Sequence, residues 1–408
     1  MIDYYETKTH PVTKRMVLEA YRKVKQNKGS AGIDEQSIQD FDKNLQKNLY
    51  KLWNRMSSGS YFPSPVKEVK IPKKSGGTRS LGIPTVADRV AQQVVKYFLE
   101  PKIDHLFHPD SYGYRRDKNA HQAIHTATQR CFKAAWVIDM DIKGFYDNID
   151  HELMMKAVRF YTQERWIILY VERWLKAGIM KEGLLQERDK GTPQGGVVSP
   201  LLANIFLHIA FDKWMQKTQP HVQFERYCDD IIVHCKSEQQ TMFIKTRINE
   251  RMKECKMELH ESKTKIVYCQ NVWNRVKQTN SSFDFLGYTF RPRVCHTKPN
   301  PLLLFVPCMS ESSMKSVRTK VKDFGLTKFK GKVQALSQKL NPQIRGWMAY
   351  YCKFTKWATL KLWRWLNLKL YRWVMKNKGY NKLKAIKWMK SVYQTQPNLF
   401  AHWQLCRP

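Results

Sequence analysis

The stretch Arg226-Tyr227-Cys228-Asp229-Asp230-Ile231-Ile232-Val233 places two adjacent acids between apolar residues. Residues 224–235 have the pattern of a β-hairpin, with Cys228 and Asp229 at its centre. An Asp-Asp pair alone is ordinary turn chemistry, because Asp favours tight turns. Here both flanks are hydrophobic, and a carboxylate in such surroundings is costly unless it is paired or binds a metal.

A second acidic stretch lies upstream. Residues 136–142 are predicted to form a buried strand, on which the two-residue period puts Asp139 and Asp141 on one face. If this strand neighbours the hairpin, Asp141 and Asp229 project into one cleft. Oxygen ligands from two strands suit Mg²⁺. Two such ions ~4 Å apart can activate an attacking hydroxyl and hold a leaving pyrophosphate.

The charge of the chain points to a polyanionic partner. The 408 residues carry 71 Lys and Arg against 35 Asp and Glu, a net charge of +36. Residues 301–408 hold 22 of the cations and only two acids, Glu311 and Asp323. Nucleic acid is the first candidate partner of such a chain. A ribosome-like or merely soluble basic protein is the alternative, which charge alone does not exclude. Seven of the 13 Trp lie in this basic part, and we expect most of them to be core.

Other classes of protein are disfavoured. No apolar run approaches the ~20 residues of a transmembrane helix, and the first residues do not have the pattern of a signal peptide. The nine cysteines are odd in number and never spaced Cys-x-x-Cys. That usage indicates a reducing compartment and argues against a zinc module.

The front of the chain reads as mixed helix and strand. Residues 11–60 are predicted to be helical, with a basic turn at 27–32, and a strand at 66–71 leads into a hairpin turn at 72–79. Thr85 and Asp88 form a capping box for a helix that Pro101 is expected to end. A buried helix is expected at 201–214, preceded by Ser199 as its cap and Pro200 as a first-turn proline. A second helix is expected at 238–257, and two short strands follow near 264–269 and 283–290.

The back of the chain reads as helical. Residues 292–307 are dotted with prolines and are expected to be a domain connection. Beyond it, Trp347, Tyr350, Phe354 and Trp357 are predicted to share one helix face. A second helix is predicted to place Leu362, Leu366, Leu370 and Trp373 on one apolar face.

The motifs resemble those of a known family. Tyr227-Cys228-Asp229-Asp230 resembles the tyrosine-x-Asp-Asp hairpin of reverse transcriptases, and residues 141–151 resemble the first palm motif of their group II intron subfamily. The resemblance extends in order over almost the whole chain. It implies an α+β right-hand polymerase, with fingers and palm followed by an all-helical thumb and maturase domain. It also implies two Mg²⁺ ions, with Mn²⁺ as a substitute. Their expected ligands are Asp141, Asp229, Asp230 and the Ile142 carbonyl, the three acids being the catalytic residues.

The resemblance also implies a nucleotide site. Lys73 and Arg79 are expected to grip the triphosphate, and Gln194 to contact the nucleotide. Tyr146 occupies the position of the aromatic gate against a ribose 2′-hydroxyl, where the family usually has Phe. Cys228 stands where Ala is common. Either Lys263 or Lys265 is expected to protonate pyrophosphate.

Further blocks resemble parts of the same family outside the polymerase centre. Residues 27–34 resemble the N-terminal extension, Phe285-Leu286-Gly287 the primer grip, and residues 340–351 the maturase signature. The RNA-binding residues implied by that signature are Arg345, Gly346, Trp347 and Tyr350. Residues 387–390 and 399–403 resemble a short DNA-binding region, without the His-Asn-His endonuclease.

Four domains are expected. Residues 1–65 are an N-terminal extension and the start of the fingers, and residues 66–295 are the fingers and palm. Residues 296–378 are the thumb and maturase domain, and residues 379–408 are a short basic tail resembling a DNA-binding region. The implied function is RNA-directed DNA polymerisation with assistance to intron splicing and retrohoming. A free-standing enzyme of DNA repair or phage defence is the alternative, and the intact acids argue against a splicing factor without polymerase activity. The implied partners are intron or other template RNA, DNA primer or target, and dNTPs, in the bacterial cytoplasm at the nucleoid, without a membrane.

Overall fold

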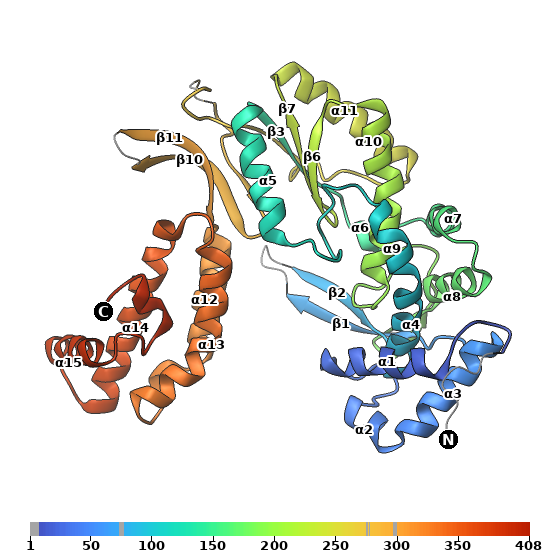
Figure 1. Ribbon diagram of the computed structural model, residues 1–408, viewed down its shortest axis with the longest axis horizontal. Helices are drawn as coiled ribbons and strands as arrows, with labels where there is room; N and C mark the ends of the chain where they lie inside the picture. The colour runs from blue at the N-terminus through green and yellow to red at the C-terminus, as the bar shows by residue number, and fades with distance from the viewer. Residues whose placement is uncertain (1–7, 73–76, 275, 277, 297–299) are drawn as a thin grey trace. The chain divides into compact units, whose positions relative to one another are not determined.

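The computed structural model describes residues 8–72, 77–274, 276, 278–296 and 300–408 (Figure 1). Lys73, expected at the nucleotide triphosphate, lies outside the described residues. The chain forms two compact units. Unit 1 comprises Met1–Asn119 and Met140–Lys265, and unit 2 comprises Ala120–Asp139 and Ile266–Pro408. No helix of the described part is long and apolar enough to cross a membrane.

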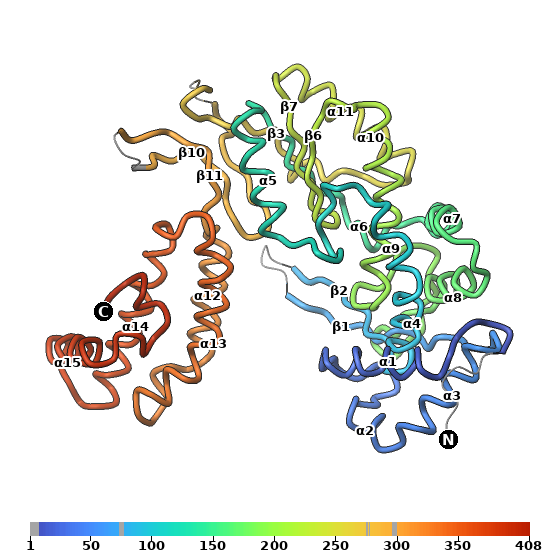
Figure 2. The backbone as a smooth tube through the Cα atoms, viewed as in Figure 1, coloured from blue at the N-terminus to red at the C-terminus, as the bar shows by residue number. Residues whose placement is uncertain are grey.

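Unit 1 begins with three helices, blue in Figure 2: α1 (Lys14–Gln26), α2 (Ile38–Lys43) and α3 (Leu45–Ser58). Thr13 and Ser37 cap the first two through their side chains. The helices and the break between them agree with the prediction from the sequence. A cap matters because the first turn of a helix has backbone N–H groups without partners.

The fourth helix, α4 (Val86–Ile103), packs against α1. It begins as predicted, with Thr85 accepting from the backbone of Asp88. The prediction that Pro101 ends it is wrong, because the helix continues to Ile103. A proline removes one helical hydrogen bond, and burial of Leu99 and Ile103 compensates for that loss in the last turn. A short 3₁₀ turn, η1 (Asp104–Leu106), follows.

A four-stranded sheet in unit 1 has the order β2-β1-β4-β5. The strands are β1 (Val66–Pro72), β2 (Thr78–Ile83), β4 (Ile179–Lys181) and β5 (Leu184–Gln186). β1 and β2 are antiparallel, as predicted, with Ile71 opposite Arg79. This hairpin presents Arg79 from a short, exposed strand.

The sheet that carries the acids has the order β6-β7-β3-β8. Its strands are β3 (Trp136–Asp141), β6 (Gln223–Tyr227), β7 (Asp230–Cys235) and β8 (Lys265–Tyr268). The hairpin prediction is confirmed, since β6 and β7 pair up to Tyr227 opposite Asp230. Only Cys228 and Asp229 remain in the turn, and Cys228 has a positive φ of 60°.

The remaining helices of unit 1 are α6 (Phe145–Asn148), α7 (His151–Tyr161), α8 (Arg165–Lys176), α9 (Ser199–Leu207), α10 (Lys213–Thr218) and α11 (Glu238–Glu254). The expected Ser199 cap is wrong: Ser199 is already helical and Val198 precedes it without a side-chain cap. The buried helix predicted over 201–214 is also interrupted. A π-helical segment, His208–Asp212, joins α9 to α10. Such segments reorient side chains, and here one of them is the fully buried Asp212.

Unit 2 contains a three-stranded sheet of order β11-β10-β9, built from β9 (Phe283–Phe285), β10 (Tyr288–His296) and β11 (Pro301–Met309). α5 (Ala120–Lys133) lies against β11. The prediction that residues 292–307 form a connection is wrong, because residues 292–296 lie in β10 and residues 301–307 lie in β11, which pairs with it. Prolines are compatible with it because β11 is an edge strand, and β10 pairs with β9 only up to Phe290.

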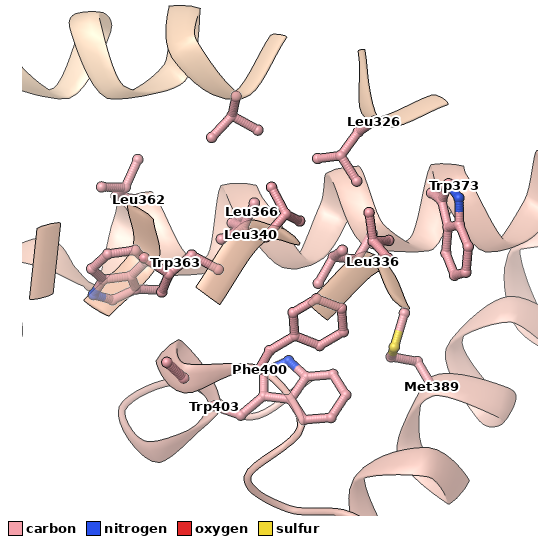
Figure 3. Packing of buried hydrophobic residues seen from close by; sticks show 14 of the residues in the cluster. Leu326, Leu336, Leu340, Leu362, Trp363, Leu366, Trp373, Met389, Phe400 and Trp403 are labelled. Atoms are coloured by element: carbon pink, nitrogen blue, oxygen red, sulfur yellow. The ribbon is translucent and has the colours of Figure 1, made fainter. Parts of the chain in front are cut away.

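The C-terminal part of unit 2, from Glu311 onward, is helical. It contains α12 (Glu311–Asp323), α13 (Val333–Tyr351), α14 (Leu360–Lys378), α15 (Lys382–Thr395) and the 3₁₀ turns η3 (Leu326–Lys328), η4 (Lys356–Thr359) and η5 (Ala401–Gln404). Their shared core includes Trp363, Trp373 and Trp403 (Figure 3). The register from Leu362 to Trp373 is confirmed as buried. The face expected from Trp347 to Trp357 is not continuous, because α13 ends at Tyr351.

Candidate active site

The acidic turn between β6 and β7 is held tightly by the backbone beside it. Tyr112 donates its N–H to the Arg226 carbonyl at 2.8 Å, so the preceding segment runs alongside β6. A Cβ on Gly113 would stand 2.5 Å from the Cys228 nitrogen. Only glycine permits this approach, and the Cys228–Asp229 turn is therefore buttressed by residues more than a hundred positions upstream.

The structure brings Asp229 and Asp141 into one electrostatic environment. Burial raises the pKa of Asp229, and the negative charge of Asp141 raises it as well, while Arg79 opposes the shift. Asp141 ends β3, and Asp230, the first residue of β7, follows Asp229 directly. Two carboxylates that repel each other in a partly desolvated place are stabilised by a cation between them.

These acids fit a magnesium site that is completed by its substrate. In the part of the chain that the structure describes, no group of three or more His, Cys, Asp or Glu could hold a metal ion. Mg²⁺ bound at substrate phosphates commonly takes only one or two carboxylates from the protein. Asp141 and Asp229 supply such a pair, and the Ile142 carbonyl and Asp230 are adjacent to them in the chain.

A pocket in unit 1 contains several of the predicted nucleotide-site residues. Its lining includes Arg79, Tyr114, Tyr146, Gln194 and Gly195. The Arg79 guanidinium donates to the side-chain carbonyl of Gln194, whose amide lies 3.4 Å from Asp147 Oδ1. The backbone of this loop packs on β2, because the Gly82 N–H donates to the Gln194 carbonyl at 2.9 Å. The structure thus joins Arg79 and Gln194, which are 115 positions apart.

Tyr146 forms a buried wall of the same pocket and is tied to the acidic turn. Its hydroxyl lies 2.8 Å from the Cys228 Sγ. Burial, together with the Cys228 thiol, raises the pKa of Tyr146. Burial and Asp229 raise the pKa of Cys228 to about 12. Both groups are therefore neutral at physiological pH and share one hydrogen bond.

The two candidate lysines are placed differently. Lys263 Nζ lies 3.3 Å from Asp141 Oδ2, whereas Lys265 is an exposed residue at the start of β8. The remaining predicted residues lie in unit 2. Phe285 ends β9, and Leu286 and Gly287, both with positive φ, form the turn into β10.

Tyr350 joins this turn to α13. Its hydroxyl donates to the Leu286 carbonyl at 2.8 Å, and the Tyr288 hydroxyl donates to the Tyr350 carbonyl. The signature residues Arg345 and Gly346 are exposed on α13, whereas Trp347 packs against the helical core. The turn and the tyrosine of the maturase signature therefore act as one structural piece.

Two features of the site were missed from the sequence. One is Tyr114, which lines the same pocket as Arg79 and Gln194 and has a positive φ that no residue pattern signals. The other is a buried polar cluster around Arg226. Arg226 Nε and Nη2 donate to the two carboxylate oxygens of Asp212 at 2.8 and 2.7 Å, and Nη1 donates to Asn204 at 2.9 Å. A charged residue inside the apolar strand at 224–235 was the available signal for this cluster.

The Arg226 cluster also reaches the acidic turn. Nη1 of Arg226 donates to the Cys228 carbonyl at 3.1 Å, and Asn204 donates to the Gly113 carbonyl at 2.8 Å. Burial would raise the pKa of Asp212, but Arg226 and His208 hold it below the usual value. The turn is therefore anchored from inside unit 1 by a charged network with no contact to solvent.

Comparison with known proteins gives two family matches. The reverse transcriptase (RNA-dependent DNA polymerase) family matches residues 71–290, and the group II intron maturase-specific domain matches residues 314–393.

Among individual proteins, Protein YkfC of Escherichia coli (strain K12) is 30% identical over 315 residues, covering 66% of this chain and 78% of YkfC. Group II intron-encoded protein LtrA of Lactococcus lactis subsp. cremoris is 34% identical over 210 residues, covering 51% of this chain and 34% of LtrA. The chain thus spans about a third of the length of LtrA. A solved telomerase from Candida albicans, in complex with a fragment of telomeric RNA, covers 90% of this chain and 69% of its own, with 12% identity and a TM-score of 0.49.

Proposed function

Since the chain belongs to the reverse transcriptase (RNA-dependent DNA polymerase) family and carries a group II intron maturase-specific domain, we propose that it copies RNA into DNA and assists the splicing of a group II intron RNA. The observation that carries the polymerase proposal is the coupling of Asp141 to Asp229 at the end of β3 and the turn between β6 and β7. The proposed substrates are an RNA template, a DNA primer and dNTPs, and they would place the protein in the cytoplasm at the nucleoid.

The proposed chemistry is in-line attack of the primer 3′-hydroxyl on the α-phosphate of a dNTP. Asp141 and Asp229 would hold Mg²⁺, with Asp230 supporting the geometry and the Ile142 carbonyl as a further ligand. When bound, two such ions lower the pKa of the attacking hydroxyl and neutralise charge on the departing pyrophosphate. Lys263 is favoured over Lys265 as the group that protonates pyrophosphate, because its ammonium lies beside Asp141.

The nucleotide would be recognised by the pocket in unit 1. Arg79 binds triphosphate oxygens, and its contact with Gln194 fixes the guanidinium at the pocket. The ring of Tyr146 occupies the space that a ribose 2′-hydroxyl needs, which favours deoxyribonucleotides. Lys73, which lies outside the described residues, is proposed as a second phosphate contact from its place in the sequence motif.

The maturase role is proposed from unit 2. Its helical part matches the maturase-specific domain, and residues 301–408 contain 22 cations and two acids. Such a surface binds folded RNA through phosphate contacts, with a strong dependence on salt. Arg345 and Gly346 on the exposed face of α13 are the proposed RNA contacts, and Trp347 and Tyr350 hold that face in place.

Primer extension tests the polymerase assignment. Asp229→Asn should abolish extension on an RNA template in Mg²⁺ or Mn²⁺, while circular dichroism and RNA affinity stay unchanged. Asp323→Asn, the same chemical change at an exposed position on α12, should retain full activity. Robust extension by the Asp229→Asn protein would overturn the assignment. For the maturase role, a group II intron should splice faster with the protein than without it at moderate Mg²⁺.

A further inference from the structure

Unit 2 contains a second pocket, which none of the proposed roles uses. It lies where the β10–β11 hairpin meets η4 and the start of α14. Three cations line it, Arg293, Lys361 and Arg364, together with the apolar side chains of Met309, Trp357 and Leu360. Its lining therefore combines three cations with an aromatic ring.

The positive charge of this pocket is only partly compensated. No carboxylate belongs to its lining among the described residues, and Glu311, which pairs with Lys361, is the acid beside it. The Nε of Arg293 is buried and has no hydrogen-bond partner in the described part of the chain. This nitrogen is closed to solvent and the guanidinium also hydrogen-bonds the Cys308 side chain, so an anion in the pocket meets the positive charge of Arg293 rather than its Nε.

The aromatic ring of the pocket is open to solvent. Trp363, Trp373 and Trp403 are buried in the helical core, whereas Trp357 is 46% exposed. The Arg293 guanidinium carbon lies 5.8 Å from the centre of the Trp357 ring. An exposed indole beside a cation is the combination on which single-stranded nucleic acids stack.

We propose that this pocket binds one unpaired nucleotide of a single strand. The base stacks on Trp357, and its phosphate accepts hydrogen bonds from Lys361 and Arg364, next to the positive charge of Arg293. Leu360 and Met309 shield the contact from water. Binding itself stands on the pocket alone, whereas its use in holding intron RNA rests on the proposed maturase function. Binding of an extruded or terminal nucleotide would thereby fix the position of the RNA on the basic surface.

Photocrosslinking of the full-length protein locates the contact. The probe is a single-stranded RNA hexamer with one 5-iodouridine, and its DNA counterpart is the second arm. After irradiation and tryptic digestion, we expect the RNA hexamer to be crosslinked to the peptide of residues 357–361, which contains Trp357. Excess uridine monophosphate should compete if a single nucleotide suffices. Competition by inorganic phosphate alone would instead indicate an anion site without base stacking and would overturn the proposal.

Matched variants test the contribution of each wall. Lys361→Gln leaves the tryptophan in place and should lower the crosslink yield several-fold, whereas Lys376→Gln, an exposed cation at the far end of α14, should change it less than twofold. Trp357→Ala should weaken hexamer affinity about tenfold, and Trp357→Phe should restore most of it. Unchanged affinity in Trp357→Ala would refute the stacking.

The Asp229→Asn protein separates this inference from the polymerase assignment. It should crosslink as the unsubstituted protein does, because the pocket contains no polymerase residue. Normal extension by the Asp229→Asn protein with an intact crosslink would refute the polymerase assignment and leave the pocket assigned. Absence of the crosslink in the unsubstituted protein, with normal extension, would refute the pocket alone.

Discussion

Arg226 and Asp212 form a two-point ion pair, at 2.8 and 2.7 Å, in which neither side chain has any solvent exposure. Through a further bond to the Cys228 carbonyl, the same guanidinium holds the turn that presents Asp229. The turn that carries Asp229 thus depends on a charge pair that must remain complete, since a buried charge without its partner is strongly destabilising.

Breaking this pair should destabilise unit 1 severely. Asp212→Asn leaves the Arg226 charge buried without compensation, so we expect the free energy of unfolding to fall by about 3 kcal/mol or more. Urea unfolding at pH 7.5 measures the change. The exposed pair Arg247–Glu250 provides the control, because Glu250→Gln should cost under about 0.5 kcal/mol. Equal effects of the two substitutions would contradict the importance of the buried pair.

Replacing both partners separates stability from positioning. In Asp212→Leu with Arg226→Met no charge remains buried, and stability should return to within about 1 kcal/mol of the original. The Cys228 carbonyl nevertheless loses its donor. Primer extension should therefore stay at least tenfold reduced in kcat, and full recovery of extension would show that the pair serves stability alone.

Arg79 should act mainly on nucleotide binding. Arg79→Gln removes a cation from the pocket, so KM for dNTP should rise about tenfold or more, in line with the loss of a charge-assisted hydrogen bond. Single-nucleotide incorporation measures this. Lys70→Gln is the control, because Lys70 lies on β1 of the same hairpin but pairs with Glu182. A similar rise in both variants would indicate a general effect of charge.

Tyr146 should control the choice of sugar. Tyr146→Val opens the space beside the ribose, so the ratio of kcat/KM for dNTP over rNTP should fall at least tenfold. Tyr146→Phe keeps the ring and should keep most of the discrimination, although it loses the bond to Cys228. Competition between dCTP and CTP on one template measures the ratio. Unchanged discrimination in the valine variant would exclude Tyr146 as the gate.

His402 should make unit 2 sensitive to acid. Burial lowers its pKa to about 3, and its Nε2 lies 2.8 Å from Asn367 Oδ1. An unfolded histidine titrates near 6.5, so between pH 6.5 and 3 the unfolded state binds more protons than the folded state. Stability is therefore complete above pH 6.5 and falls with decreasing pH, by about 2 kcal/mol at pH 5.

The variant His402→Phe isolates this contribution. Its stability should fall about 2 kcal/mol less than that of the unsubstituted protein between pH 7.5 and pH 5, because all other titrating groups are shared. Urea unfolding monitored by tryptophan fluorescence at several pH values gives the comparison. Parallel curves for the two proteins would show that His402 does not carry the acid sensitivity.

Local patterns determined much of this protein. The β6–β7 hairpin, the strand that ends at Asp141 and the helices from α1 to α4 follow from alternation, capping residues and apolar periodicity. These signals act over a few residues and survive in any tertiary context. Proline was a mixed signal. Pro200 lies in the first turn of α9 as predicted, whereas Pro101 is tolerated in a last helical turn, and Pro292, Pro301 and Pro307 lie in strands with a free edge.

Only the tertiary structure decided which distant side chains meet. Tyr146 with Cys228, Arg79 with Gln194, and Arg226 with Asp212 are joined by strand order and by the π-helical segment that turns Asp212 inward. No periodicity encodes such pairs, since they depend on how whole elements pack. The acids of the site could thus be named from the sequence. The hydrogen bonds that hold Asp229 at its turn, and the exposed Trp357 beside the cations of its pocket, required the fold.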